Sequence, residues 1–368
     1  MQFITKGPHV PERLIQAHEE GRVVFFCGAG ISYPARLPGF GGLVDRIYGE
    51  VGESPSVLEK SAIKGGKYDT AIGLLEARIA PDGRGRELVR TAVSRILTSA
   101  EVSKKSTATH AALLTLARSR NGQTRLVTTN FDRLFEEVIL RDGIQANVLH
   151  APLLPVPKNR WDGLVYLHGL LAPAPTPKDL DRLVLSSGDF GLAYLTERWA
   201  ARFVSELFRN YTVCFVGYSI NDPVLRYMMD ALAADRLLGE SPPEMFAFGS
   251  HPKGKEEAQE AEWCAKNVTP ILYREHHHHL YLHRTLHAWA STYRDGVGGK
   301  EQIIVQYANS QPQHSTKEED FVGRVLWALS DKSGLPALRF ANLVPAPPFG
   351  WIESFIEPRF GHDDLTRF

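Results

Sequence analysis

Cysteine is scarce in this sequence, which holds only Cys27, Cys214 and Cys264 among its 368 residues. Three widely spaced cysteines cannot supply the four thiolates of a four-cysteine zinc site. Two of them, Cys27 and Cys214, lie within apolar runs of the kind that form buried strands. We therefore expect buried free thiols, as in proteins of a reducing compartment.

Net charge and long apolar runs are also absent. The 42 basic and 42 acidic residues cancel, so the overall charge gives no reason to expect a nucleic-acid or membrane partner, although a local patch would not show in a sum. No apolar run approaches the roughly 20 residues that a membrane helix requires. The N-terminal sequence MQFITKGPHVPERL also lacks the apolar core of a signal peptide. We expect a cytoplasmic protein that binds neither membranes nor nucleic acid.

What the sequence does contain is a series of short apolar runs, rich in β-branched and aromatic residues, that alternate with helical patterns. Continuous apolarity is typical of strands that are buried on both faces of a parallel sheet. Strands alternating with helices predict an α/β fold, here a Rossmann-like, doubly wound parallel sheet of about six strands. The six runs are VVFFC (23–27), RLVTT (125–129), LVYLH (164–168), TVCFVG (212–217), MFAFG (245–249) and TPILYR (269–274).

The spacing of these runs predicts the domain organisation. About 100 residues separate the first two runs, far more than one crossover helix requires. We expect a small helical module there, at about 45–120, that covers one side of the ligand crevice. The sheet domain then occupies 1–298. Residues 299–368 read as a helical and proline-rich extension that ends in DDLTRF without a closing element, so we expect the start of a truncated C-terminal region of a longer protein.

A glycine-rich turn, CGAGIS, follows the first run. Gly28 and Gly30 allow a tight turn and a close approach to a pyrophosphate, and exposed N–H groups there attract anions. The fingerprint of hydride-transferring enzymes has a third glycine or alanine where this chain has Tyr33. Asp45 or Glu50 lies at roughly the distance expected of a ribose-binding acid, so a dehydrogenase remains open on this motif alone.

Polar residues follow two further runs at the point where each leaves the sheet. Thr129, Asn130 and Asp132 end or follow RLVTT, and His168 ends LVYLH. In open α/β sheets, ligands bind at this edge. An asparagine amide can both donate and accept hydrogen bonds, and an imidazole can take a proton near neutral pH. Without further context, Asn130 could equally cap a helix, and His168 could be a structural histidine.

Four motifs in a fixed order resemble the sirtuin family, which binds NAD at the crevice of a Rossmann-like sheet. They are GAGIS with a downstream PGF (38–40), TTNFD (128–132), LHG (167–169) and VGYSINDP (216–223), and the resemblance covers roughly Gly21 to Trp289. Sirtuin protein deacylases carry a zinc ribbon with two Cys-x-x-Cys pairs, which this chain lacks. The sequence is instead similar to the NAD hydrolases of bacterial antiphage defence, the defence-associated sirtuins.

This resemblance implies hydrolysis of the N-glycosidic bond of NAD+ to nicotinamide and ADP-ribose, through a transition state like an oxocarbenium ion. It makes Asn130 and His168 the catalytic pair, with Asp132 accepting from the carboxamide or supporting Asn130. The turn after the fourth run would contact the ribose and phosphate side of NAD+ through Gly217 and Ser219. Read from the residues alone, Asn221 or Asp222 could simply cap the next helix, and we assign Asp222 mainly to that capping. No metal is expected. The residues assigned to NAD+ binding are Gly28, Ala29, Gly30, Ser32, Phe40, Thr129, Gly217 and Ser219.

The resemblance also implies partners and a biological role. NAD+ depletion would protect a population by abortive infection, in a homo-oligomer, with a tetramer implied. A phage structural protein would be the activator, recognised by the missing C-terminal region. The alternatives are an NAD-dependent deacylase or ADP-ribosyltransferase, a non-enzymatic sensor of NAD or ADP-ribose, and a dehydrogenase.

Two further patterns carry weaker expectations. The segment SSGDFGLAYL (186–195) resembles another part of the defence sirtuins, and we expect its helix over the nicotinamide side, with Asp189 mainly a helix cap. His279, His283 and His287 recur at i, i+4 and i+8, which places a histidine row on one helix face. No carboxylate lies at a good ligand position on that face, so surface histidines or a subunit contact are favoured over zinc.

Overall fold

A computed structural model describes residues 1–79, 84–157, 161–220, 222–229 and 243–356; Asn221 and the closing DDLTRF lie outside the described residues. The chain forms two compact units. One comprises Met1–Gln16 with Ile271–Phe368, and the other comprises Ala17–Pro270. No helix in the described ranges is long and apolar enough to cross a membrane.

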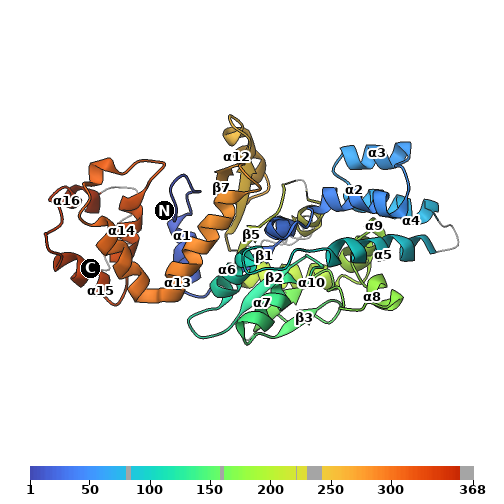
Figure 1. The fold of residues 1–368 in the computed structure, drawn as a ribbon, viewed down its shortest axis with the longest axis horizontal. Coiled ribbons are helices and arrows are strands. Elements are labelled where there is room, and N and C mark those ends of the chain that lie inside the picture. Colours follow the sequence, from blue (N-terminus) through green and yellow to red (C-terminus); the bar gives the residue numbers. More distant parts are fainter. Residues whose placement is uncertain (80–83, 158–160, 221, 230–242, 357–368) are drawn as a thin grey trace. The chain divides into compact units, whose positions relative to one another are not determined.

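The fold belongs to the predicted α/β class and is built on a seven-stranded parallel sheet (Figure 1). The strand order is β3-β4-β2-β1-β5-β6-β7. Because the chain moves from β1 to one side and later returns to its other side at β5, the order reverses next to β1, where open sheets bind ligands. The strands are β1 (Val23–Cys27), β2 (Arg125–Thr128), β3 (Val148–His150), β4 (Gly163–Tyr166), β5 (Thr212–Val216), β6 (Met245–His251) and β7 (Thr269–Arg274).

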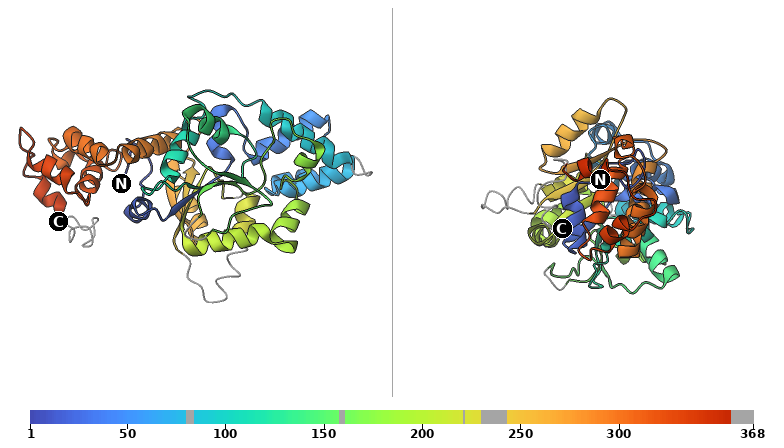
Figure 2. Two further views of the ribbon diagram at one scale, coloured as in Figure 1. Left: turned by 90° about the horizontal axis from the view of Figure 1, so that it is seen from below. Right: turned by 90° about the vertical axis from the view of Figure 1, so that its left-hand side faces the viewer.

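The central strand β1 is buried along its whole length, because helices cover both faces of the sheet (Figure 2). Successive side chains of a strand point to opposite faces. Phe26 accordingly packs against Phe208 of helix α10 (Trp199–Asn210), while α6 (Ala108–Ala117) contacts β1 and β2. The continuous apolar runs of the sequence are explained by this double coverage.

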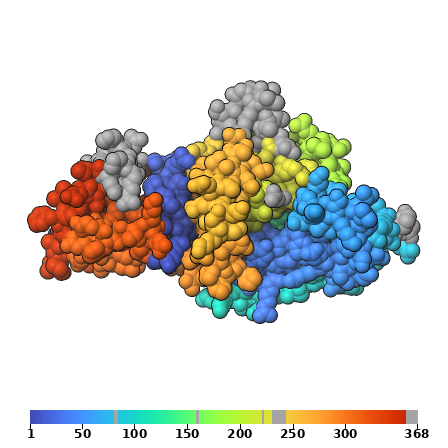
Figure 3. All heavy atoms as spheres, turned by 90° about the horizontal axis from the view of Figure 1, so that it is seen from above, coloured from blue at the N-terminus to red at the C-terminus, as the bar shows by residue number. Residues whose placement is uncertain are grey.

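The stretch between β1 and β2 is helical and includes the predicted insertion. The apolar core of this stretch also includes residues from the loops after β2 and β4. Leu43 and Ile72 pack in one apolar cluster with Phe131, which follows β2, and Leu183, which follows β4. Figure 3 shows the blue surface of this stretch beside a yellow-green surface, and helix α4 contacts α9 (Ser187–Phe190). The elements are η1 (Ala29–Ala35), α2 (Phe40–Val51), α3 (Val57–Lys64), α4 (Tyr68–Ile79), α5 (Arg84–Thr98) and α6.

The remaining helices of the larger unit connect the later strands. Residues 223–229, which follow β5, are also helical. The short helix α9 continues directly into the π-helix η2, and both follow β4. The bounds are α7 (Leu134–Asp142), α8 (Pro177–Asp181), α9 (Ser187–Phe190), η2 (Gly191–Thr196) and α12 (Glu256–Cys264).

The smaller unit is helical and has its own core. Helix α13 (Leu280–Tyr307) is interrupted at Gly296, whose φ is 58°, and it runs through the boundary predicted at residue 299. Trp351 is buried among apolar residues of α13 and α14 and donates to the Ala308 carbonyl over 2.7 Å. The other elements are α1 (Glu12–Glu19, whose last turn belongs to the larger unit), η3 (Pro312–His314), α14 (Phe321–Leu329), α15 (Leu335–Ala341) and α16 (Trp351–Phe355).

Candidate active site

The polar residues that follow β1, β2 and β4 meet around one cavity at the carboxyl edge of the sheet. The cavity is open to solvent, and the space free of atoms within it and at its mouth is about 560 Å³. Asn130 and Asp132 come from the end of β2, His168 from the end of β4, and Ser32 from the η1 turn after β1. The full lining is Ala29, Ser32, Leu37, Pro38, Phe40, Leu43, Leu97, Thr129, Asn130, Phe131, Asp132, His168, Val184, Phe190, Asp222 and Val224.

Three of these side chains form a hydrogen-bonded series. Asn130 Nδ2 donates to Ser32 Oγ over 3.2 Å, and Ser32 Oγ donates to Asp132 Oδ2 over 3.0 Å. The other Asp132 oxygen accepts from the Leu134 N–H at the start of α7. Burial raises the pKa of Asp132, although these hydrogen bonds oppose the rise. The series fixes the Asn130 amide and leaves its oxygen as an acceptor for a ligand.

His168 also lines this cavity and is 1% exposed. Its Nε2 is 2.9 Å from the Tyr194 hydroxyl, and the ring of Phe190 meets the imidazole edge-to-face at 5.1 Å. Burial lowers the pKa of His168 to about 3. The imidazole is therefore neutral at physiological pH, as a proton acceptor must be.

We expect acid to destabilise the fold through His168. The folded state takes up no proton at this site until the pH approaches 3, whereas the unfolded chain binds one below about 6.5. The free energy of unfolding should therefore decrease as the pH falls below about 6.5, by up to roughly 1.4 kcal/mol per pH unit. Urea titrations between pH 7.5 and pH 5 measure this slope. His168→Gln should reduce this slope, although the buried His18 and His283 still contribute to it, and identical slopes in the two proteins would contradict the assignment.

A second cavity, rich in glycine, adjoins the first. It is also open to solvent, with about 1170 Å³ of space free of atoms including its mouth, and both cavities are lined by Ala29, Phe40 and Asp222. The Gly30 N–H donates to the Gly217 carbonyl over 2.9 Å, so the turns after β1 and β5 are in direct backbone contact. The lining residues are Ala29, Gly30, Tyr33, Gly39, Phe40, Gly41, Gly42, Ile63, Lys64, Gly65, Gly66, Tyr68, Gly217, Ser219, Asp222 and Pro223.

Ten of the eleven residues predicted for the site therefore line one or both cavities. Gly28 lines neither, and its role is structural: a Cβ there would lie 2.9 Å from the Gly217 carbonyl oxygen. The candidate ribose acids Asp45 and Glu50 are exposed on α2 and line neither cavity. The ten residues are Ala29, Gly30, Ser32, Phe40, Thr129, Asn130, Asp132, His168, Gly217 and Ser219.

Asp222 combines two positions. Its Oδ1 accepts from the Val224 N–H over 2.9 Å, which confirms the predicted helix cap. It also lines both cavities, and burial raises its pKa to about 6. The sequence did not indicate that Asp222 would line the cavities, because an aspartate directly before Pro223 is already accounted for as a helix cap.

Other supporting residues were not predicted, because they come from distant parts of the chain. His110 of α6 places its Nε2 3.4 Å from Ser32 Oγ. The Tyr218 hydroxyl is 2.7 Å from Thr129 Oγ1 and donates to the Cys27 carbonyl. Tyr194 lies within the segment noted in the sequence, but no pattern there indicates contact with His168.

Of the two weaker sequence patterns, the capping role of Asp189 is confirmed and the histidine row on one helix is not. Asp189 caps α9 in a capping box with Ser186, as predicted. The histidine row is wrong as a feature of one helix, because α13 begins at Leu280 and His279 precedes it with a left-handed φ of 64°. His283 is buried, and within the described ranges no group of three or more His, Cys, Asp or Glu residues is placed to hold a metal ion.

Part of the chain that carries this site is similar to known proteins. Residues 124–271 match the SIR2-like domain family, a span that includes Asn130, Asp132, His168, Gly217 and Ser219. The chain is also 32% identical over 342 residues to the uncharacterized protein y4cA of Sinorhizobium fredii (strain NBRC 101917 / NGR234). That alignment takes in 91% of this chain, which spans only 28% of the length of the relative. This chain therefore contains a SIR2-like domain over residues 124–271.

Proposed function

We propose that this chain is an NAD+ glycohydrolase, which converts NAD+ and water to nicotinamide and ADP-ribose. The observation that carries the proposal is the first cavity. It brings a fixed amide, Asn130, and a neutral imidazole, His168, to the lining of one cavity at the sheet edge. An adjoining cavity with a glycine-rich lining offers room for the rest of a dinucleotide.

The chemistry required of the site is limited. The bond between the ribose C1′ and the nicotinamide ring nitrogen breaks, and its electron pair leaves with nicotinamide, which becomes neutral. A water oxygen bonds to C1′ and releases one proton. The Asn130 oxygen can accept from a ribose hydroxyl or from the water, and His168 can take the proton. Holding these groups in one geometry lowers the barrier.

The second cavity suits the ADP portion of NAD+. Gly30 and Gly217 both line this cavity, and we place the pyrophosphate against their turns. Ser219 offers a hydroxyl, and Lys64 supplies the cation in the lining. Asp222, at the junction of the cavities, is placed to accept from a ribose hydroxyl.

For the biological role we propose antiphage defence, in which a homo-oligomer depletes the cell of NAD+ once a phage protein activates it. The ordered motifs described above support this role. The matched relative is more than three times as long as its aligned portion, which fits a sensor region beyond the aligned segment. A hydrolase that consumes a shared cofactor requires such control.

The proposal is tested by incubating the protein with NAD+ and separating the products by chromatography. Nicotinamide and ADP-ribose are expected in equal amounts, without any acceptor. Nicotinamide release that depends on an added acylated peptide would instead indicate a deacylase. Binding of NAD+ measured by calorimetry, with no product in either this chain or its natural full-length form with a phage lysate, would indicate a sensor.

A further inference from the structure

One side chain beside the candidate active site has no role in the chemistry above. The Tyr194 hydroxyl lies 2.9 Å from His168 Nε2. His168 lines the first cavity, whereas Tyr194 does not. Because imidazole has only two ring nitrogens, Nδ1 is the nitrogen left for a ligand. The nitrogen that would take a proton is therefore determined by how Tyr194 binds the other one.

We propose that Tyr194 is a positioning residue for His168: its phenol oxygen accepts a hydrogen bond from Nε2–H, and this leaves the Nδ1 lone pair for the cavity. The proposal rests on the proposed function, in which His168 takes a proton from water or from a ribose hydroxyl. In the opposite tautomer, Nδ1 would carry a hydrogen and could not accept another. Fixing the tautomer therefore fixes the direction of proton transfer.

The charge states of the pair agree with this arrangement. Burial lowers the pKa of His168 and raises that of Tyr194, so imidazole and phenol are both neutral. A neutral phenol can accept a hydrogen bond from Nε2–H. Aromatic contacts restrict the tyrosine ring further, since Tyr194 and Phe190 both stack on Tyr227, at 5.7 Å and 4.8 Å between ring centroids.

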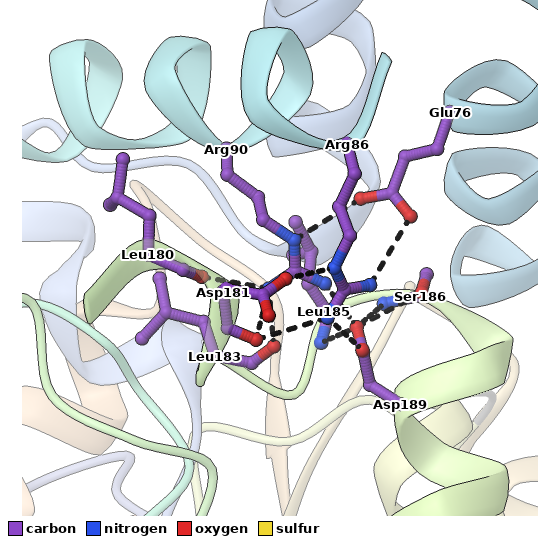
Figure 4. Close-up of polar contacts among 9 residues, drawn as sticks. All are labelled: Glu76, Arg86, Arg90, Leu180, Asp181, Leu183, Leu185, Ser186 and Asp189. Carbon is purple, nitrogen blue, oxygen red and sulfur yellow. Dashed lines mark hydrogen bonds and ion pairs between the residues drawn. The ribbon is translucent and has the colours of Figure 1, made fainter. Parts of the chain in front are cut away.

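A charge cluster holds α9, which continues directly into the π-helix that carries Tyr194, and Figure 4 shows its arginines around Asp189. Arg90 of α5, only 1% exposed, pairs with Asp189 Oδ2 and donates to the Leu180 and Leu183 carbonyls. Arg86, one turn earlier, donates to Asp189 Oδ1 over 2.6 Å. Burial alone raises the pKa of Asp189, but Arg90 and the Ser186 hydrogen bonds outweigh it, so its pKa is lowered and the carboxylate is charged.

This cluster links the helical insertion to the imidazole. Asp189 Oδ2 also accepts from the Ser186 N–H over 2.8 Å, so the start of α9 is anchored to α5. Phe190 and Tyr194 follow one and five residues later and contact His168. A four-residue helix has little stability of its own. We therefore assign the placement of Tyr194 to the Arg86–Arg90–Asp189 pairs together with the Tyr227 stack.

The test compares Tyr194→Phe with wild type by histidine ¹⁵N NMR and by NAD+ turnover. In the wild type, the His168 signals, identified by their loss in His168→Gln, should report the Nε2–H tautomer. In Tyr194→Phe they should shift toward a tautomer mixture, with kcat reduced about tenfold and KM changed less than twofold. Asp189→Asn should shift the same signals in the same direction by a smaller amount.

Tyr227→Phe is the matched control, because it removes a hydroxyl from the same aromatic stack that bonds to Asp69 rather than to His168. In this variant the His168 signals should keep their wild-type positions, and kcat and KM should each stay within twofold of the wild-type values. An Nδ1–H tautomer in the wild type, or unchanged signals in Tyr194→Phe, would overturn the proposal. The NMR measurement needs no turnover, so it decides the role of Tyr194 even if NAD+ is not cleaved. Absence of NAD+ cleavage would count only against the proposed hydrolase function. Unchanged signals in Asp189→Asn would remove the charge cluster from the proposal.

Discussion

Replacing Asn130 by alanine is expected to abolish NAD+ cleavage while the fold stays intact. The side chain lies at the sheet edge and lines the cavity, and its amide donates to Ser32 without taking part in the apolar core. Truncation removes the group that orients the ribose hydroxyls and the water. Nicotinamide release measured by chromatography gives the rate, and circular dichroism confirms that the variant is folded.

The matched control for this variant is Asn147→Ala. Asn147 is an exposed asparagine ahead of β3 whose amide donates to the Asp162 carbonyl over 3.3 Å. Its replacement should leave the rate unchanged. If Asn130→Ala kept more than about a tenth of the wild-type rate, the barrier would have changed by less than roughly 1.4 kcal/mol. Its assignment as a catalytic residue would then be wrong.

Gly217→Ala is expected to cost roughly 3 kcal/mol of stability and most of the activity. Gly217 has a φ of 77°, and a Cβ there would lie 2.8 Å from the Ile31 nitrogen and 2.9 Å from the Gly28 oxygen. The left-handed backbone alone costs alanine about 1 kcal/mol, and the overlap with backbone atoms adds about 1–3 kcal/mol. The η1 turn that carries Ser32 must move away to relieve it. Urea denaturation measures the loss.

Gly254→Ala separates the two contributions to this loss. Its φ is 78°, almost the same as that of Gly217, but a Cβ there meets no atom within 4 Å. We therefore expect about 1 kcal/mol of destabilisation and unchanged NAD+ turnover. Equal losses in the two variants would mean that the contact between the turns after β1 and β5 contributes nothing beyond the backbone conformation.

The sheet could be predicted because most of its strands are buried on both faces. Runs such as VVFFC then contain no polar residue, and all six predicted strands are present. The seventh strand, β3, was not predicted. It has only three residues, Val148–His150, it is partly exposed at the edge of the sheet, and its two apolar residues end in a histidine. No continuous apolar run of the kind that marks the buried strands forms there.

The site could be predicted in part for a related reason. The carboxyl ends of neighbouring parallel strands meet at one edge, so residues such as Asn130 and His168, which follow predicted strands, were expected together. Tyr194 and His110 reach the site from helices instead, and whether two such side chains touch depends on helix packing that no local pattern encodes. The prediction of a histidine row on one helix was wrong because it relied on regular spacing alone. The helix starts only at Leu280, so His279 lies outside it.

The distribution of the three cysteines provides a single attachment point for a probe. Cys27 and Cys214 are buried in adjacent strands and burial raises the pKa of both thiols, whereas Cys264 at the end of α12 is exposed. Reaction with a maleimide requires an accessible thiolate, so the folded protein takes up dye at Cys264 alone. Mixing donor-labelled and acceptor-labelled chains then measures self-association by energy transfer without any substitution, and it keeps every residue of the candidate active site unmodified.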